Sequence, residues 1–195
     1  MTRRPGRLRA IPLPDPPLAD AATGTVLRPW GRHDLAADAE SLATAWQDTE
    51  VARATAVPAR PSVALAARWI AGEAERREQG LAIDLVVAAA ADGGRRVLGE
   101  VGLAHLDLQG RAEIGFWLGS EHRRRGAATA AVVLLTAWAL APAEEASGLG
   151  RTRLWARTVP GDARAAAVLE RAGYQGRGEA SGSRVWTIDA ASVPP

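Results

Sequence analysis

The residues whose types and spacing most clearly suggest chemistry form one short run, three arginines followed by small residues: Arg123, Arg124, Arg125, Gly126, Ala127, Ala128 and Thr129. The run follows a strand-like segment, residues 112–118, and leads into an apolar segment of helical character. The first N–H groups of a helix have no partner within the helix, and together with the helix dipole they attract anions. Gly126 lets a ligand approach the backbone, and the arginines carry forked donors that suit phosphate. The run therefore predicts a phosphate-binding turn.

The composition excludes several other kinds of chemistry. The 195 residues include no cysteine, which rules out thiol catalysis, disulfides and thiolate metal sites. His33, His105 and His122 lack the spacing of metal ligands, so no metal site is expected. The formal net charge is only +2, and a small excess of arginine does not establish the clustered basic face that nucleic-acid binding needs. Nucleic acid is therefore not an expected partner.

The two ends of the chain are expected to lie outside the folded unit. Prolines at positions 5, 12, 14, 16 and 17 indicate a flexible, Pro/Arg-rich tail over residues 1–22. Residues 23–190 are predicted to form a single domain, followed by a short tail over residues 191–195. No apolar run is long enough to span a bilayer, and no signal peptide is indicated. We expect a soluble, cytoplasmic protein that does not bind membranes.

Hydrophobic periodicity predicts the elements that hold the arginine run in place. Strands are predicted at residues 25–28, 81–90, 97–108, 111–118, 153–159, near 174 and at 184–189. Helices are predicted at residues 35–46, 62–80, from 127 onward and at 162–172, with a loop or broken helix at 47–60. This order predicts an α/β fold of the α+β type, with one mixed sheet of about seven strands and about four helices on both faces.

Several segments resemble one known family in the same order: residues 27–30 with Asp34, then 51–70, 98–103, 112–118, 123–129 and 168–174. With these motifs the chain resembles the GNAT acetyltransferase superfamily, and within it the RimJ/RimL type of ribosomal-protein N-terminal acetyltransferases. The family's pyrophosphate signature is Gln or Arg, two residues, Gly, one residue, then Gly or Ala. Arg123, Gly126 and Ala128 match it. The likeness spans residues 25–188.

The resemblance implies that the chain binds acetyl-CoA as co-substrate and uses no metal. In this family a mostly antiparallel sheet splays between its fourth and fifth strands, and the pantetheine arm lies in the opening. Here the arm would contact Phe116, Trp117 and Leu118, and the phosphates would lie on residues 123–129. A diphosphate needs converging N–H donors, and an amide-rich arm needs an unpaired strand edge, so the physical requirements agree. An N–H near Phe116 or Trp117 would hold the oxyanion.

Two positions of the cofactor-binding surface depart from the family pattern. The family commonly has Asn, two residues, then Ser at the start of its fourth helix, where this chain has Asp162 and Ala165. That Ser often protonates the departing thiolate, and other branches use a tyrosine where this chain has Leu169. A thiol of pKa about 8.5 leaves tolerably as thiolate, so the loss should slow the reaction without preventing it. Asp162 is expected to cap the helix.

Two glutamates are candidates for the general base. Strand alternation places Glu113 on one face with Gly115 and Trp117, and the family often carries its base at the position of Glu113. A carboxylate there can accept the proton of an incoming ammonium, whereas a polar residue paired with an arginine is the structural alternative. Glu100, on the adjoining strand, is the second candidate.

Three residues are candidates for the acceptor side. Trp30 ends the first strand, and the segment 47–61 lines the acceptor side in the family. Asp48 and Glu50 in that segment have the charge to attract a cationic amine, although a solvated loop explains both acids equally well. Trp46, Trp69 and Trp138 fall on or beside apolar helix stripes and are expected to pack in the core.

We interpret the chain as an acetyl-CoA-dependent N-acetyltransferase in which a primary amine attacks the thioester directly. The acceptor would be a small-molecule or peptide amine, such as a protein N-terminus, and a homodimer is compatible with the sequence. Two alternatives stay open at this point. The first is an acyl-CoA-binding or sensing module without turnover, which Ala165 and Leu169 favour slightly. The second is an arginine-rich binder of ribosomes or nucleic acid, supported only by the tail and the arginine run.

Overall fold

The computed structural model describes residues 8–55, 57–143 and 148–192. The strands of this part of the chain are β1 (Ala19–Asp20), β2 (Thr25–Pro29), β3 (Ile83–Ala89), β4 (Val97–Ala104), β5 (Arg111–Leu118), β6 (Arg153–Thr158), β7 (Gln175–Ala180) and β8 (Ser183–Asp189). The α-helices are α1 (Leu35–Ala45), α2 (Thr49–Ala54), α3 (Val63–Ala71), α4 (Glu73–Glu78), α5 (Ala127–Leu140) and α6 (Ala163–Arg171). Short 3₁₀ turns, η1 (Ala90–Asp92), η2 (Ser120–His122) and η4 (Ala190–Ser192), complete it.

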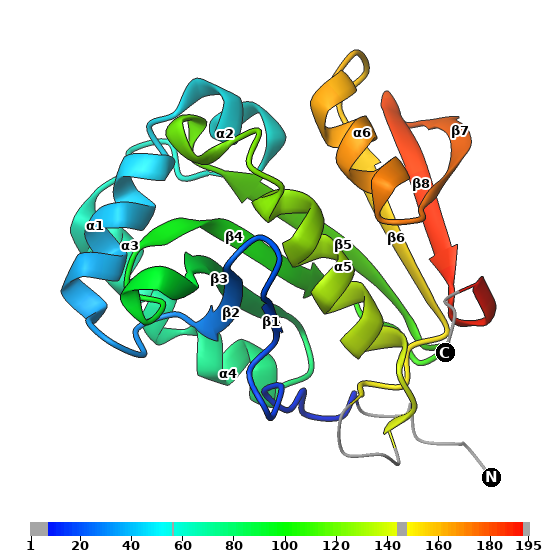
Figure 1. Ribbon diagram of the computed structural model, residues 1–195, viewed down its shortest axis with the longest axis horizontal. Helices are drawn as coiled ribbons and strands as arrows, with labels where there is room; N and C mark the ends of the chain where they lie inside the picture. The colour runs from blue at the N-terminus through cyan, green and yellow to red at the C-terminus, as the bar shows by residue number, and fades with distance from the viewer. Residues whose placement is uncertain (1–7, 56, 144–147, 193–195) are drawn as a thin grey trace, which may run out of the picture.

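One mixed sheet runs through the molecule in the order β1-β2-β3-β4-β5-β6-β8-β7 (Figure 1). Every neighbouring pair is antiparallel except β5 and β6, which are parallel. The prediction of a mixed, mostly antiparallel sheet is confirmed. The sheet has eight strands, one more than expected, because β1 adds a two-residue strand beside β2.

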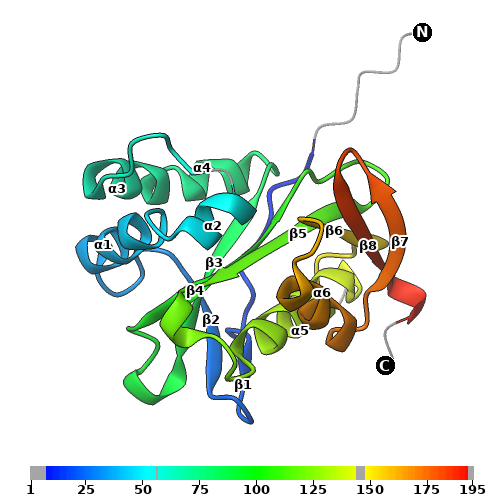
Figure 2. The same ribbon diagram turned by 90° about the horizontal axis from the view of Figure 1, so that it is seen from above.

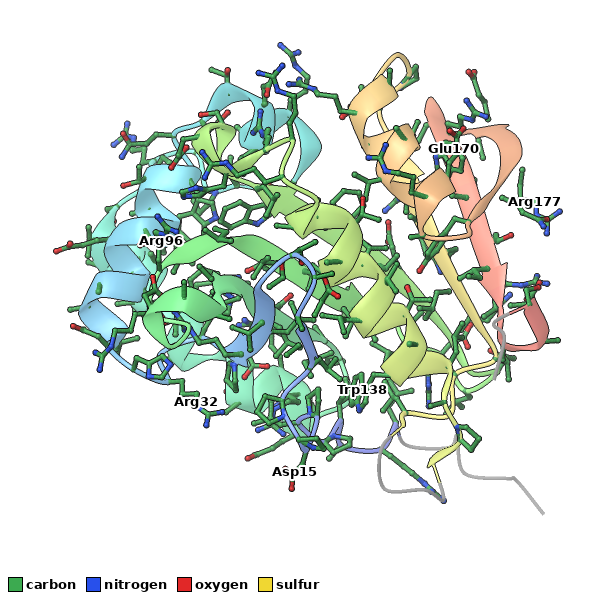
Figure 3. The ribbon with its side chains drawn as sticks, in the orientation of Figure 1. Asp15, Arg32, Arg96, Trp138, Glu170 and Arg177 are labelled. Carbon is green, nitrogen blue, oxygen red and sulfur yellow. The ribbon has the colours of Figure 1, made fainter. Side chains whose placement is uncertain are left out.

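Helices cover both faces of the sheet, as the sequence predicts. Figure 2 shows α1 to α4 on one face and α5 with α6 on the other. On the α5 face, Leu135 and Trp138 pack on a cluster that includes Leu103 and Ile114. Trp138, near the C-terminal end of α5 (Figure 3), is only 4% exposed, which confirms its predicted place in the core. The sheet is therefore buried between two hydrophobic layers.

The second layer lies under α1 and α3. It contains Leu42 and Ile70 of these helices packed on Val86 of β3, together with Trp46. Trp69 is half-buried and packs edge-on against the rings of Trp30 and Trp46, at centroid distances of 6.2 and 6.4 Å. The tryptophans predicted as packing residues on this face therefore share one apolar cluster.

The described part of the N-terminal stretch, from Leu8 onward, packs on the domain, whereas the sequence predicts a flexible tail to residue 22. Ile11 is 1% exposed, and its N–H and C=O both hydrogen-bond to Arg77, at 2.9 Å each. The Leu18 carbonyl accepts the N–H of Leu27 at 2.8 Å, where β1 begins. Neighbouring prolines restrict the unfolded chain, which reduces the entropy lost when this stretch is ordered.

Two other segments differ from the predicted boundaries, and a third, predicted to be a loop or broken helix, contains a short helix. The helix predicted over residues 62–80 is interrupted at Gly72, which ends α3 and begins α4. The segment 47–60 contains the short helix α2, because the Asp48 side chain accepts the N–H groups of Glu50 and Val51 and caps it. The strand predicted to reach residue 108 ends at Ala104, because His105 has a φ of +49° and leaves extended geometry.

The sheet opens between β5 and β6. Within the described residues these strands pair at three positions, Arg111 with Arg153, Ala112 with Leu154 and Glu113 with Trp155. Beyond Glu113, β6 continues its pairing with β8 while β5 continues with β4. The splay that the resemblance implies is therefore present, and it leaves residues 114–118 of β5 with a free backbone edge.

A buried ion pair joins β2 to α1 in the half of the sheet that contains β5. Arg28 and Asp38 are 3% exposed and make two hydrogen bonds of 2.7 Å. Arg28 also donates to the carbonyls of Gly94 and Arg95 in the β3–β4 turn, and Asp38 accepts the Gly31 N–H at 2.8 Å. One charged pair therefore fixes a strand, a helix and a hairpin relative to one another.

We expect Asp38→Ala to lower the free energy of unfolding by about 3–5 kcal/mol, because it leaves the Arg28 charge buried without a partner of opposite charge. The measurement is urea unfolding followed by circular dichroism. Glu40→Ala, an exposed position on the same helix, is the control and should change stability by no more than about 0.5 kcal/mol. A loss below about 1 kcal/mol for Asp38→Ala would contradict the structural role of the pair.

Candidate functional site

A cavity of about 390 Å³ lies at the opening between β5 and β6, within the range of small-molecule sites. Every residue predicted to bind the cofactor, except Arg125, lines it: Phe116, Trp117, Leu118, Arg123, Arg124, Gly126, Ala127, Ala128, Thr129, Asp162 and Ala165. Three separate segments of the sequence therefore meet at one cavity. Arg125 lies outside its lining.

The turn before α5 has the geometry of an anion site. Arg124 and Gly126 have left-handed backbones, with φ of +61° and +85°. Within the described residues no side chain caps α5, so the N–H groups of its first turn stay free. These donors belong to Ala127, Ala128 and Thr129, which line the cavity. The turn can therefore bind a phosphate group with main-chain donors.

The edge of β5 supplies a second set of donors. Gly119 donates its N–H to Leu98 on β4 at 3.0 Å, and along an antiparallel pair alternate residues turn to alternate sides. Trp117 therefore directs its N–H toward β4, and Phe116 directs its own toward the gap beside β6. Of the two N–H groups considered from sequence, only that of Phe116 points at the cavity.

Helix α6 forms the opposite wall. Asp162 caps it by accepting the Ala165 N–H at 3.0 Å, which confirms the predicted cap. Ala165 leaves this wall without a hydroxyl. Sequence reasoning did not identify six further lining residues: Val51, Ala163, Arg164, Ala167, Val168 and Arg171. The lining residues on α6 follow Asp162 at helical spacing, so this periodicity could have predicted them from the sequence.

Asp48 and Glu50 do not stand as free anions on the acceptor side. The Glu50 carboxylate pairs with Arg123 and with Arg164. Asp48 Oδ2 lies 3.3 Å from Arg123 Nη2, and Arg123 Nε donates to the Leu118 carbonyl at 3.0 Å. Both carboxylates, which were predicted to attract a cationic amine, therefore contact arginines at the cofactor cavity.

Glu113 lies at the closed end of the splay, where its strand still pairs with β6. Arg157 binds its carboxylate with two hydrogen bonds of 2.9 and 3.2 Å, and His105 Nδ1 lies 2.7 Å from it. The His105 ring stacks on Trp155 at a centroid distance of 6.3 Å. The Glu113 carboxylate is therefore already occupied by Arg157 and His105.

Glu100 has a different environment. Its half-buried carboxylate accepts the indole N–H groups of Trp30 and Trp117, at 2.9 and 3.1 Å. Burial, and after it the negative charge of Asp84, raise the pKa of Glu100 to about 8, against the lowering effect of the two indole hydrogen bonds. Burial also raises the pKa of Asp84 to about 6. Trp30, 7% exposed, is therefore a buried donor that positions Glu100.

Two glycines lie side by side between Glu100 and Glu113. Gly102 of β4 is the partner of Gly115 of β5. A side chain at Gly115 would meet no atom within 4 Å, whereas one at Gly102 would approach Asp84 Oδ1 at 2.6 Å. Strand alternation, as predicted, puts Trp117 in the core cluster of this face and Ile114 in the other. This face of the sheet is therefore open beside the free edge of β5.

The described part of the chain contains neither a metal-binding cluster nor a membrane-spanning helix. No group of three or more His, Cys, Asp or Glu side chains there is arranged to hold a metal ion. None of the helices there has the length and apolar character to cross a membrane.

Comparison with known proteins identifies one family. The family model for the acetyltransferase (GNAT) domain matches residues 25–175 of the chain. No curated protein matches the chain.

Solved structures resemble the chain in fold at low sequence identity. RimJ of Mycobacterium smegmatis, in complex with CoA-disulfide, is 20% identical with a TM-score of 0.70, covering 92% of this chain and 88% of that one. The ribosomal-protein-S5-alanine acetyltransferase of Vibrio fischeri is 17% identical with a TM-score of 0.70, covering 93% and 100%. The microcin C7 self-immunity acetyltransferase MccE, in complex with acetyl-CoA and AMP, is 17% identical with a TM-score of 0.66, covering 85% and 92%.

The left-handed glycine of the anion turn gives a direct test of the cavity. We expect Gly126→Ala to weaken CoA binding about tenfold, because a Cβ there strains the turn and meets Thr23 Cγ2 at 3.0 Å. Gly93→Ala is the matched control, since Gly93 also has a positive φ, of +71°, but lies in the β3–β4 turn with open space around it. Isothermal titration calorimetry measures both. Equal CoA affinities for the two variants would contradict the assignment of the turn.

Proposed function

This chain belongs to the GNAT acetyltransferase family and is an acetyl-CoA-dependent N-acetyltransferase, and on that premise we propose how its residues bind the coenzyme and carry the reaction. The acceptor is a small-molecule or protein amine. The observation that carries the proposal is the free edge of β5, residues 114–118, which leads from the anion turn into the cavity. We propose a primary amine as the acceptor, at a protein N-terminus or on a small molecule.

In this proposal the diphosphate of acetyl-CoA lies on the free N–H groups of the first turn of α5. The pantetheine arm runs along β5, where Ile114, Phe116 and Leu118 direct their backbone groups into the gap. An arm that carries two amides can hydrogen-bond to such an edge as an additional strand does. The thioester then lies beside Gly115, on the open face of the sheet.

The reaction is a direct transfer. The lone pair of a neutral amine attacks the thioester carbonyl, and the Phe116 N–H stabilises the negative charge that develops on the carbonyl oxygen. Collapse of the tetrahedral intermediate breaks the C–S bond, forms the amide and releases CoA as thiolate. Ala165 and Leu169 offer no proton to this thiolate, and its low basicity lets it leave unaided.

Glu100 is the proposed proton acceptor, in preference to Glu113. An acceptor works best when its pKa lies near the working pH, and the raised pKa of Glu100, about 8, meets that condition. Its partners, the indoles of Trp30 and Trp117, are neutral and do not compete with an ammonium. Glu113 is held by Arg157, and we assign it to positioning of β5 against β6.

The acceptor side carries negative charge suited to an amine. The carboxylate of Asp84 lies over Gly102 and faces the same side of the sheet as Glu100. Arg76 Nη2 lies 3.4 Å from Asp84 and balances part of this charge. A cationic amine that enters over Gly115 therefore approaches two acidic groups, and it loses its proton before it attacks.

We expect acetyl-CoA to raise the melting temperature of the protein and an amine panel to release free CoA thiol. The panel contains peptides with free N-termini, the same peptides with blocked N-termini, and small primary amines. Thiol release is followed with a thiol-reactive dye, and product mass identifies the acetylated nitrogen. Binding of acetyl-CoA without thiol release from any amine would instead favour a binding module without turnover.

We expect Glu100→Gln to lower kcat about 10²-fold and to remove the rise of kcat with pH. The pKa of Glu100 is raised, so its carboxyl is mostly protonated below pH 8 and becomes an acceptor above it. In the wild type, kcat should therefore increase with pH through about 8. A pH–rate profile of both proteins between pH 6 and 9.5 is the measurement.

Glu113→Gln is the rival variant for this experiment. It breaks the pair with Arg157, and we expect it to lower stability while keeping the pH-dependent rise of kcat. If Glu113→Gln removes that rise and Glu100→Gln keeps it, the two roles must be exchanged. CoA affinity is measured for both variants, because loss of the base should leave it unchanged.

A further inference from the structure

The carboxylate of Glu50 is bound on both sides by arginines of the cofactor cavity. One oxygen pairs with Arg123, in the turn before α5, and the other with Arg164, in the first turn of α6. These partners are 73 and 114 residues away in sequence. Glu50 therefore joins the two walls of the cavity through one side chain.

The position of this contact is the open end of the splay. At one end β5 and β6 pair at three positions, and from there the strands diverge toward α2 and α6 (Figure 1). Helix α2, which carries Glu50, stands on one side of the opening, and α6 stands on the other (Figures 1 and 2). The Glu50–Arg164 pair therefore bridges the gap where the two halves of the sheet are farthest from their paired end.

Glu50 also borders both hollows at this end of the molecule. It lines the cavity of about 390 Å³ and a second, adjoining hollow of about 320 Å³, which Arg53 and Arg164 also line. Each of the two guanidinium groups that Glu50 holds thus faces a space large enough for a ligand. A carboxylate in this position occupies donors that a phosphate group would use.

The number of negative charges decides whether Glu50 or a bound phosphate group pairs with Arg123 and Arg164. Glu50 brings one negative charge and two oxygens, shared between two guanidinium groups. A diphosphate brings more charge and more acceptor oxygens, and arginine forks bind it bidentately. The Glu50 side chain is 41% exposed, so it can turn into solvent, while Val51 beside it is 1% exposed and keeps α2 in place.

We propose that Glu50 is an internal competitor for the phosphate groups of the coenzyme: it holds Arg123 and Arg164 across the cavity, and the coenzyme displaces it on binding. This inference rests on the proposed cofactor site and adds a residue that sets its affinity. The exchange moves one side chain and breaks no covalent bond. As a result, the protein binds the coenzyme with lower affinity, and releases it more readily, than it would if the two arginines had no competing carboxylate.

The test is Glu50→Gln, which keeps the size of the side chain and removes its charge. We expect the variant to bind free CoA about three- to tenfold more tightly than the wild type, the range that two exposed ion pairs support, with a faster association rate. Calorimetry gives the affinity, and stopped-flow tryptophan fluorescence gives the rate.

Glu121→Gln is the matched control, since it removes the same charge from η2, two residues before Arg123. The Glu121 side chain is 68% exposed and pairs with His122, not with the cavity arginines. A general electrostatic effect would change CoA affinity equally in both variants, and this outcome would overturn the proposal. Unchanged or weaker binding by Glu50→Gln would also overturn it, because Glu50 would then be positioning the arginines for phosphate.

These outcomes are separable from failure of the proposed function. If the wild type binds CoA and Glu50→Gln binds it no more tightly, only the role of Glu50 is lost. If neither protein binds CoA, the cofactor site itself is wrong, and the role of Glu50 fails with it. Circular dichroism and the melting temperature of each variant establish that it is folded.

Discussion

The unfinished pairing of β5 with β6 is the constraint on which the site depends. A parallel pair that continued through Leu118 would satisfy the backbone and close the cavity. Because it stops after Glu113, the backbone groups that Ile114 and Phe116 direct away from β4 have no strand partner in the described chain, and groups of this kind seek one. The free edge, the anion turn at its end and the wall formed by α6 all follow from this one divergence. The buried pair of Arg28 and Asp38 joins β2, α1 and the β3–β4 turn within the half of the sheet that contains β5.

The two candidate bases show how neighbours, and not residue type, assign chemistry. Glu113 and Glu100 are on adjacent strands, facing the same open side of the sheet. Glu113 has the guanidinium of Arg157 beside it. Glu100 has two indoles and a neighbouring acid, and its pKa is raised. A neutral hydrogen-bond donor orients a carboxylate without removing its affinity for protons, which is what an acid–base role requires.

Sequence reasoning succeeded where the signal was local. The place of the arginine run between a strand and a helix, the cap at Asp162 and the alternation along β5 each depend on residues within a few positions of one another, and the structure has these three features as predicted. It failed where side chains meet across the fold. Nothing near Glu50 in sequence indicates Arg164, and nothing near Glu113 indicates Arg157. The packed N-terminal stretch was missed for a related reason, since its prolines resemble those of a disordered tail while the groups that bind Ile11 belong to α4.

The paired glycines of β4 and β5 differ in what they permit. Gly102 is confined by the Ile83 carbonyl and the Asp84 side chain, so its lack of a side chain is compulsory. Gly115 has empty space above it, so larger residues can be accommodated there at no cost in packing. In the proposed site the thioester lies beside Gly115, so a side chain at this position would narrow the space that the thioester shares with the acceptor amine. Substitution of Gly115 is therefore a way to narrow the range of amines that the enzyme accepts.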